Sequence, residues 1–162
     1  MTITKDRIVR DGLYQGMRKQ IDPFAFDDAV SNVFPDMIRR SIPGYQSLVD
    51  ITGLIATKRI HPGTRCYDLG CSHGATTASI LRAIGDRRCE IVAIDSSAPM
   101  IAAARANLVD QRISFQHADI RDIKYVDASF IAANFTLQFL PPEDRLALLR
   151  LSLIHISEPT RL

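Results

Sequence analysis

Several features that would place a protein in a special class are absent from this 162-residue chain. It has no apolar run near the roughly 20 residues that cross a bilayer, and its first residues, MTITKDRIVRDG, lack the apolar segment of a secretory signal. The formal net charge is only +2, so no strong basic field is available to attract nucleic acid. We therefore predict a cytoplasmic protein that contacts neither a membrane nor, directly, nucleic acid.

Cysteine is also scarce. The three cysteines, Cys66, Cys71 and Cys89, are odd in number and dispersed, which is typical of reduced thiols rather than of a disulfide framework. The spacing of Cys66 and Cys71 matches no common zinc pattern, so we predict no metal site. Otherwise 46% hydrophobic and 23% charged residues are ordinary for a globular protein, and the length fits one domain.

The hydrophobic pattern separates an arm from a domain. Residues 1–23 are polar and lack clear periodicity, whereas residues 24–151 are predicted to form the domain. Apolar residues recur at helical spacing over 24–34, and a further helix is predicted over 46–60. Between them, Pro35 marks either a helix break or a fresh start.

After residue 60, apolar strand-like runs alternate with helical patterns. Strands are predicted over 64–70, 89–97, 112–119 and within 128–140, and helices over 75–85, 98–110 and 141–150. Either Ser96 or Ser97 is a suitable N-cap for the helix that follows them. This alternation predicts an α/β fold with a parallel sheet and crossover helices.

The stretch YDLGCSHGATTASIL, Tyr67 to Leu81, joins the first of these strands to its helix. Its two glycines allow a tight turn and a close approach of the backbone N–H groups to a ligand. An acid two residues before the first glycine suits a cationic ligand group better than a pyrophosphate. The alternative is a plain strand-to-helix turn with a capping aspartate. The candidate binding residues of this turn are Asp68, Gly70, Cys71, Ser72 and Gly74.

An acid also ends the second strand. Asp95 lies 25 residues after Gly70, where a carboxylate commonly accepts hydrogen bonds from the two ribose hydroxyls of a nucleoside. Ser96 beside it is a candidate for the adenine or ribose pocket. A simple helix cap remains the alternative for both residues.

Polar residues follow the third and fourth strands as well. Asp119 can accept from an adenine amino group while Ile120 packs on the ring; a solvated loop residue is the alternative, and Asp122 could take the same role. Asn134 ends an apolar strand, where a polar side chain must find partners. Its amide could hold ligand or substrate, or could simply form a turn.

The pattern of glycines distinguishes between two nucleotide ligands. The NAD fingerprint G-x-G-x-x-G is not matched, because Gly70 and Gly74 enclose CSH. The spacing D-x-G-x-x-x-G resembles the first motif of S-adenosylmethionine-dependent methyltransferases, and Asp95 and Asp119 follow in register.

Other residues are given structural roles. His73 is predicted to face solvent rather than to act as a base, and Cys71 to be a small loop residue rather than a nucleophile. Arg39 and Arg40 are predicted to be solvated, with contact to an acidic substrate as the alternative. A buried core role is predicted for Phe135, Leu137, Phe139 and Leu140. We therefore predict no catalytic residue.

A narrower resemblance covers roughly Phe24 to Arg150. Five segments together resemble carboxy-S-adenosyl-L-methionine synthases: VFPDMIRRSIPGY, YDLGCSHGATTASIL, VAIDSSAPMI, DIRDI and NFTLQFL. The resemblance implies a Rossmann-like class I methyltransferase fold with strand order 3-2-1-4 in this chain. It also implies S-adenosylmethionine and prephenate as substrates, carboxy-S-adenosylmethionine and phenylpyruvate as products, and a homodimer. The product would pass to an enzyme that carboxymethylates a tRNA wobble uridine.

The resemblance also implies positions around the ligand. Tyr45 would lie near its methionyl or carboxyl end, and Asn134 near the sulfonium. The turn residues Gly70, Cys71 and Ser72 would line the methionine part, with Asp95 and Ser96 at the ribose side and Asp119 and Ile120 at the adenine. The alternatives are a small-molecule methyltransferase that uses S-adenosylmethionine, or a nonfunctional ligand-binding fragment.

The carboxyl end departs from the family pattern. The further strands of the family, and an arginine that contacts the added carboxylate, have no counterpart here. Residues 152–162 are predicted to be a non-native tail. The fourth strand would then be an exposed edge, so we expect low solubility or self-association.

Overall fold

The computed structural model describes residues 9–12 and 26–156, with side chains described as far as residue 151. Most of the predicted arm, 1–23, and the end of the predicted tail therefore lie outside the described residues. The elements are α1 (Asp28–Ser41), α2 (Tyr45–Arg59), β1 (Arg65–Leu69), α3 (Ala75–Ile84), β2 (Glu90–Asp95), α4 (Ala98–Asn107), β3 (Ile113–His117), η1 (Ile120–Asp122), β4 (Ala128–Ala132), η2 (Leu137–Phe139) and α5 (Pro142–Ile156).

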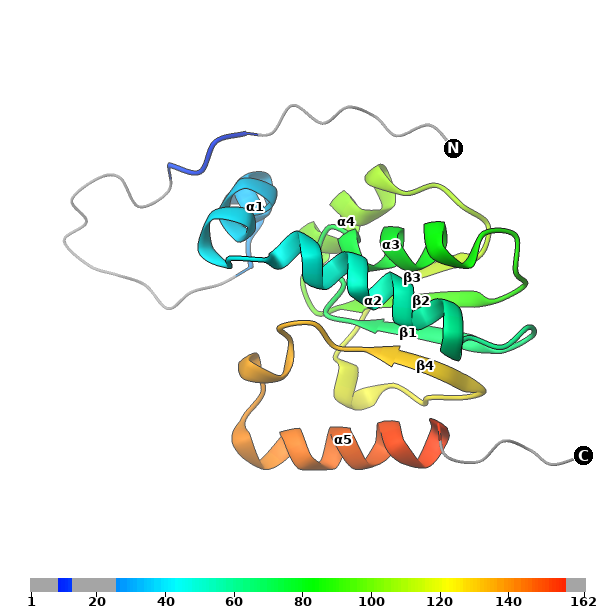
Figure 1. Ribbon diagram of the computed structural model, residues 1–162. Coiled ribbons are helices and arrows are strands. Elements are labelled where there is room, and N and C mark those ends of the chain that lie inside the picture. Colours follow the sequence, from blue (N-terminus) through cyan, green and yellow to red (C-terminus); the bar gives the residue numbers. More distant parts are fainter. Residues whose placement is uncertain (1–8, 13–25, 157–162) are drawn as a thin grey trace, which may run out of the picture.

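The four strands form one parallel sheet in the order β3-β2-β1-β4. This confirms the predicted fold and strand order. The chain reverses its direction of winding between β1 and β4, so β1 is flanked by β2 on one side and β4 on the other (Figure 1). In sheets of this kind the crevice at such a switch point, beyond the carboxyl ends of the strands, is where ligands bind.

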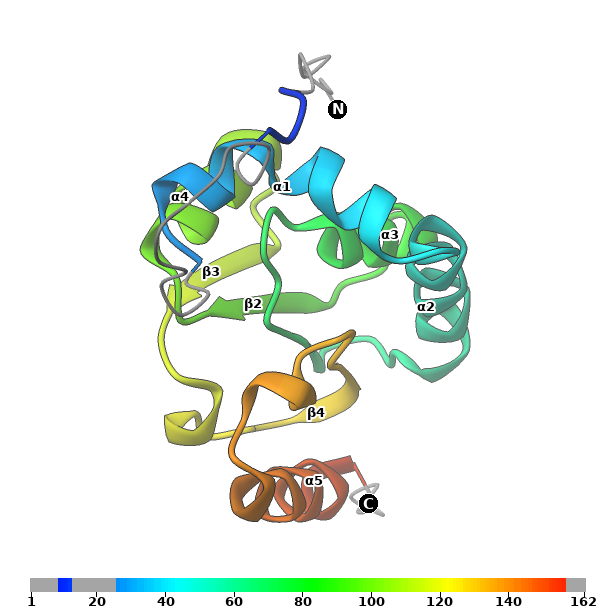
Figure 2. The same ribbon diagram turned by 90° about the vertical axis from the view of Figure 1, so that its left-hand side faces the viewer.

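Helices cover both faces of the sheet. Helices α2, α3 and α4 lie on one face and α5 on the other, so the molecule has three layers (Figures 1 and 2). Alternate strand residues supply the two cores, because successive side chains of a strand point to opposite faces. On β2, Ile91 packs in the α2–α3 core, and Val92 packs in the core that contains Leu148 of α5.

Side-chain caps fix the start of two helices. Ser97, not Ser96, caps α4, since its side chain accepts from the Met100 backbone N–H. Asp27 caps α1 by accepting from the Val30 N–H at 2.9 Å. The predicted interruption at Pro35 is wrong: α1 runs through Pro35 from Asp28 to Ser41. Val30 and Phe34 before the proline, and Met37 and Ile38 after it, pack in one cluster with Met100 of α4, which holds the helix on both sides of the proline.

Strand β4 is an edge of the sheet, as predicted. Helix α5 packs against β4, and its residue Leu148 is buried there. Apolar side chains nevertheless remain exposed on the outer faces of two helices: Leu48, Ile51, Leu54 and Ile55 on α2, and Leu146, Leu149 and Leu151 on α5. No helix within the described residues is long and apolar enough to span a membrane.

Candidate functional site

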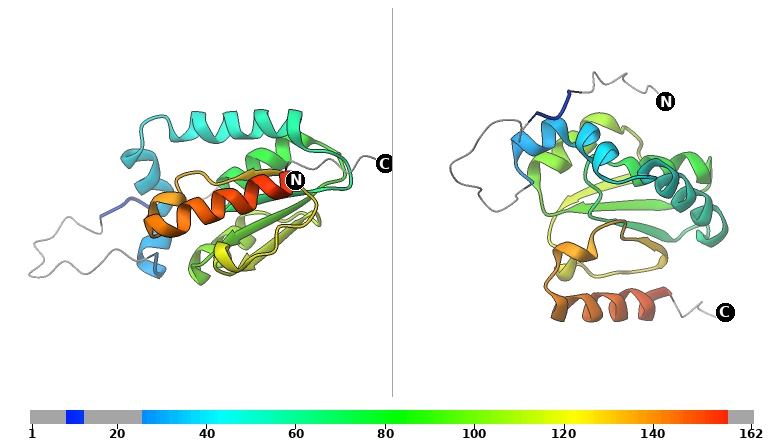
Figure 3. Two further views of the ribbon diagram at one scale, coloured as in Figure 1. Left: turned by 90° about the horizontal axis from the view of Figure 1, so that it is seen from below. Right: turned by 60° about the vertical axis from the view of Figure 1, so that its left-hand side comes forward.

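A cavity of about 410 Å³ lies at the carboxyl ends of the strands. Helix α1 and the segment after β4 lie at the same end of the sheet (Figure 3), and both contribute to the lining of the cavity. Of the predicted binding residues, Tyr45, Gly70, Cys71, Ser72, Asp95, Ser96, Asp119, Ile120 and Asn134 line the cavity. Asp68 and Gly74 do not line it.

The turn after β1 is held by bonds within the protein. The N–H groups of Gly70 and Cys71 both donate to the Ile94 carbonyl, at 2.8 and 2.9 Å. The Ser72 N–H donates to Asp95 Oδ2 at 2.9 Å. The expectation that these N–H groups would be presented to a ligand is therefore not met, because each one already serves to join the turn to β2.

Gly70 is required by its surroundings. Its φ of +72° favours glycine, and a Cβ at this position would lie 2.6 Å from Thr136 Oγ1. Thr136 is fixed there because its hydroxyl donates to the Leu69 carbonyl at 2.6 Å. The segment after β4 thus packs directly on the turn after β1. Gly74 has a structural role, since a Cβ there would meet Leu108 Cδ1 at 2.7 Å.

Asp95 has free acceptor capacity at the cavity. Its two oxygens each accept one backbone N–H, from Ser72 and Ser97, both at 2.9 Å. A carboxylate has about four acceptor positions, so room remains for hydroxyl donors of a ligand. Asp95 is only 8% exposed, and burial raises its pKa, although the two N–H bonds act against this rise.

Asp68 lies in the interior behind the turn, 1% exposed. Its Oδ2 accepts from Thr77 Oγ1 at 2.6 Å. Burial raises the pKa of Asp68 to about 6, with a smaller contribution from the negative charge of Asp95, while the Thr77 hydrogen bonds oppose the rise. Asp68 can therefore act on a cavity ligand through its charge but not by contact.

Asp119 reaches the cavity already paired. Arg121 makes a bidentate contact with it, with Nε at 3.0 Å from Oδ1 and Nη2 at 2.6 Å from Oδ2. This Arg121 contact lowers the pKa of Asp119. Arg121 also bonds Asp144 of α5 at 2.6 Å, which fixes the loop. The alternative candidate, Asp122, is exposed and does not line the cavity.

The amide nitrogen of Asn134 donates hydrogen bonds to two threonines. Nδ2 donates to Thr52 Oγ1 on α2 and to Thr76 Oγ1 on α3, both at 3.1 Å. The requirement that this polar residue find partners is thus fulfilled across three elements. Sequence analysis missed both threonines and Thr136, since a contact across 82 residues leaves no periodic signal.

Aromatic rings also line the cavity. Phe26 packs edge-on against Phe139 with centroids 5.2 Å apart, and Tyr45 lies 6.2 Å from Phe135. The predicted core role is wrong for Phe139, which is 57% exposed. Leu137 and Leu140 do pack against the core on the α5 side, and Leu140, like Phe135, also lines the cavity. The chain leaves the sheet at Ala132, so these residues surround the cavity instead of continuing the strand.

Two residues considered for chemistry have structural roles. His73 does not simply face solvent as predicted: its Nε2 is 3.0 Å from Ser31 Oγ, and its ring lies 5.5 Å from Phe34. Cys71 is buried, and burial raises the pKa of its thiol, which opposes formation of a nucleophilic thiolate. Arg39 and Arg40 are exposed, as predicted, and Arg40 pairs with Asp36 at 3.3 Å.

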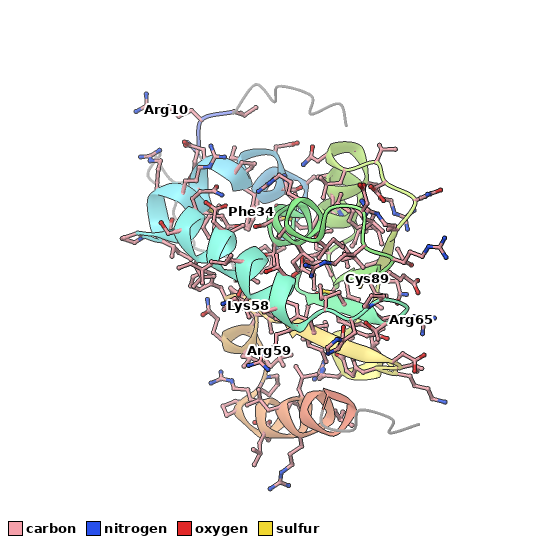
Figure 4. All side chains as sticks on the ribbon, turned by 45° about the vertical axis from the view of Figure 1, so that its right-hand side comes forward. Arg10, Phe34, Lys58, Arg59, Arg65 and Cys89 are labelled. Carbon is pink, nitrogen blue, oxygen red and sulfur yellow. The ribbon has the colours of Figure 1, made fainter. Side chains whose placement is uncertain are left out.

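A larger hollow, of about 990 Å³, lies at the opposite end of the sheet. Figure 4 shows Arg65 and Cys89, which line it, to the right of Phe34, which lines the smaller cavity. Two arginines of the larger hollow are paired with neighbouring acids, Arg65 with Glu90 at 2.7 Å and Arg112 with Asp110 at 2.9 Å. We therefore take the smaller cavity as the candidate site. No cluster of metal-binding side chains is found among the described residues.

Comparison with known proteins finds a matching family model and relatives of similar sequence. A family model described as a methyltransferase domain matches residues 67–153. The carboxy-S-adenosyl-L-methionine synthase of Shewanella baltica is 46% identical over 142 residues, which cover 85% of this chain and 58% of that protein. The enzyme of the same name from a second Shewanella strain is 46% identical over 144 residues, which cover 86% of this chain and 59% of that protein. The chain thus spans less than two thirds of these relatives, and their names confirm the resemblance found in the sequence.

Solved structures share the fold at low identity. The magnesium protoporphyrin IX methyltransferase of Synechocystis, solved with bound S-adenosylmethionine, gives a TM-score of 0.59 at 17% identity, covering 84% of this chain and 75% of that one. An amino pentose methyltransferase of Micromonospora echinaspora gives 0.55 at 15% identity, covering 85% and 55%. The strand order of the sheet and the residues that the family model matches together define a class I methyltransferase fold. The chain belongs to the methyltransferase domain family.

Proposed function

We propose that the cavity binds S-adenosylmethionine. The observation that supports this most directly is the gathering of three acceptor side chains, Asp95, Asp119 and Asn134, from the ends of β2, β3 and β4 around one cavity beside the glycine turn. Asp95 would accept from the ribose hydroxyls, and Asp119 from the adenine amino group. Ile120, 6% exposed and lining the cavity, would pack on the adenine ring.

The protein to which these residues belong would be a carboxy-S-adenosyl-L-methionine synthase. Decarboxylation of prephenate with loss of its ring hydroxyl would give phenylpyruvate, carbon dioxide and hydroxide, and the hydroxide would remove a proton from the sulfonium methyl group to form water. The carbon of the resulting ylide would then bond to the carbon dioxide, which gives carboxy-S-adenosylmethionine. For this chemistry the protein must hold two ligands together and exclude water, and no base of its own is required.

The biological setting is proposed on the same resemblance. The product would be passed in the cytoplasm to an enzyme that carboxymethylates a tRNA wobble uridine, and the enzyme would be a homodimer. Support for this comes from the 46% identity to relatives of that name.

The aromatic side chains of Phe26, Phe135 and Phe139, which line the cavity, would face the ring of prephenate.

An ordinary small-molecule methyltransferase is the second candidate, because the family model that matches residues 67–153 describes a methyltransferase domain in general. Incubation with S-adenosylmethionine and prephenate, followed by mass spectrometry, separates the two. The proposed synthase adds the mass of one carboxyl group to the S-adenosylmethionine and forms phenylpyruvate in equal amount. S-Adenosylhomocysteine formed with a methyl acceptor would instead support the methyltransferase. Binding of S-adenosylmethionine without turnover would indicate a ligand-binding fragment.

A further inference from the structure

Two threonines determine how the side chain of Asn134 is oriented. Thr52, on α2, and Thr76, in the first turn of α3, are 8% and 6% exposed, and the Oγ1 atom of each lies 3.1 Å from Asn134 Nδ2. The oxygen and nitrogen of an amide are distinguished only by their hydrogen bonds. The orientation of Asn134 therefore depends on whether these hydroxyls can donate or must accept.

The Thr52 hydroxyl settles that question. Thr52 Oγ1 donates to the Leu48 carbonyl at 2.9 Å, one turn back along α2, so its single proton is already used. Toward Asn134 it can only accept, and the amide atom that faces it must be the donor, Nδ2. An inverted amide would place two oxygens together with no proton between them, at a site largely shielded from water.

This orientation leaves the carbonyl oxygen as the end of the amide available to a ligand. Both Nδ2 hydrogens are used, one on each threonine, and Oδ1 has no protein donor within the part of the chain that the structure describes. Asn134 lines the cavity, and so does Cys71, on which both Asp68 and Asp95 act through their charges. The cavity therefore presents acceptors to a ligand, together with the carboxylate of Asp95.

We propose that Thr52 and Thr76 are positioning residues that fix Asn134 with its carbonyl oxygen toward the positively charged part of the ligand. The inference rests on the proposed binding of S-adenosylmethionine in this cavity. A carbonyl oxygen fixed toward the ligand favours a cationic centre over a neutral one at the same place. S-Adenosylmethionine carries a sulfonium there, whereas S-adenosylhomocysteine has a neutral thioether. The threonine clamp, as we call the contacts of Thr52 and Thr76 with the Asn134 amide, should therefore help to discriminate between these two ligands.

Calorimetric titration of both ligands into the chain and its variants tests this proposal. Thr52→Val removes the hydroxyl with little change in volume and should weaken S-adenosylmethionine by about tenfold, and S-adenosylhomocysteine by less than about twofold. Thr52→Ser keeps the hydroxyl and should retain both affinities. Thr57→Val is the matched control, because Thr57 lies on the same helix, donates to the Leu54 carbonyl at 2.7 Å, and does not line the cavity. Equal weakening of the two ligands by Thr52→Val, or unchanged affinity for S-adenosylmethionine, would overturn the proposal.

A second measurement needs no ligand. The side-chain amide protons of Asn134 should exchange slowly with solvent in nuclear magnetic resonance spectra, with their signals assigned by their loss in Asn134→Asp. They should exchange much faster in Thr52→Val and in Thr76→Val. Fast exchange in the unmodified chain would refute the clamp. Slow exchange in a chain that binds no S-adenosylmethionine would refute the proposed function instead and would leave the clamp itself intact.

Discussion

Asp68 is the more deeply enclosed of the two acids that are buried in the described part of the chain. Its pKa in the folded protein is about 6, compared with its ordinary value of 3.8, because burial disfavours the charged form. The protonated form is thus favoured by folding. Below about pH 3.8 Asp68 is protonated in both states, and its titration does not lower the free energy of unfolding. As pH rises, ionisation of Asp68 lowers the free energy of unfolding, and this loss is complete above about pH 6.

The size of this effect follows from the two pKa values. One pKa unit corresponds to about 1.4 kcal/mol, so complete ionisation of Asp68 should cost roughly 3 kcal/mol at pH 8. The variant Asp68→Asn cannot ionise. Its own packing and hydrogen-bond cost does not depend on pH. The free energy of unfolding of Asp68→Asn relative to the unmodified chain should therefore rise by about 2–3 kcal/mol between pH 4 and pH 8.

Urea unfolding of both proteins across this pH range measures the difference directly. Taking the difference cancels the titration of the groups that do not interact with Asp68. A constant difference from pH 4 to pH 8 would refute the assignment of a raised pKa to Asp68, and a difference that falls with pH would reverse its sign. A second arm uses the ligand: a cation in the cavity stabilises ionised Asp68, so affinity for S-adenosylmethionine should rise through about pH 6, and should lose that rise in Asp68→Asn.

Three further predictions concern the turn, the ribose contact and the sheet edge. Gly70→Ala should lower the free energy of unfolding by about 2–4 kcal/mol, because it adds the strain of positive φ and a clash with Thr136. Gly63→Ala is the control, since Gly63 has φ +78° but no atom within 4 Å of an added Cβ. In the same denaturation assay it should lower the free energy of unfolding by only about 1–2 kcal/mol. Equal costs would refute the packing argument. Asp95→Asn should weaken S-adenosylmethionine by about 10- to 100-fold in calorimetry, and an unchanged affinity would remove Asp95 from the site. The exposed β4 edge predicts concentration-dependent self-association in sedimentation, and a soluble monomer with a sharp thermal transition would contradict it.

Features with a local signal could be predicted from the sequence. The alternation of strands and helices indicates a parallel sheet, and the acid-glycine turn marks the end of β1 that faces the cavity. Asp95 and Asp119 could be placed because the carboxyl ends of parallel strands meet at one edge of the sheet. Their binding roles remain predictions for the titrations above.

Features that depend on distant packing could not be predicted. Pro35 marks a break by local rules, but tertiary contacts of α1 hold the helix through it. Phe139 belongs to an apolar run that is typical of a buried strand, yet the strand ends at Ala132 and Phe139 lines the cavity. The threonine clamp on Asn134 joins α2, α3 and the end of β4, and no spacing in the sequence records such a meeting of three elements.

Titration of S-adenosylmethionine into the purified chain, followed by calorimetry, tests the central claim most directly. We expect saturable binding to one site, abolished or strongly weakened by Asp95→Asn and unaffected by Asp86→Asn on the exposed turn beyond α3. No heat and no change in melting temperature on addition of S-adenosylmethionine would contradict the account, as would preferential binding of a nicotinamide dinucleotide.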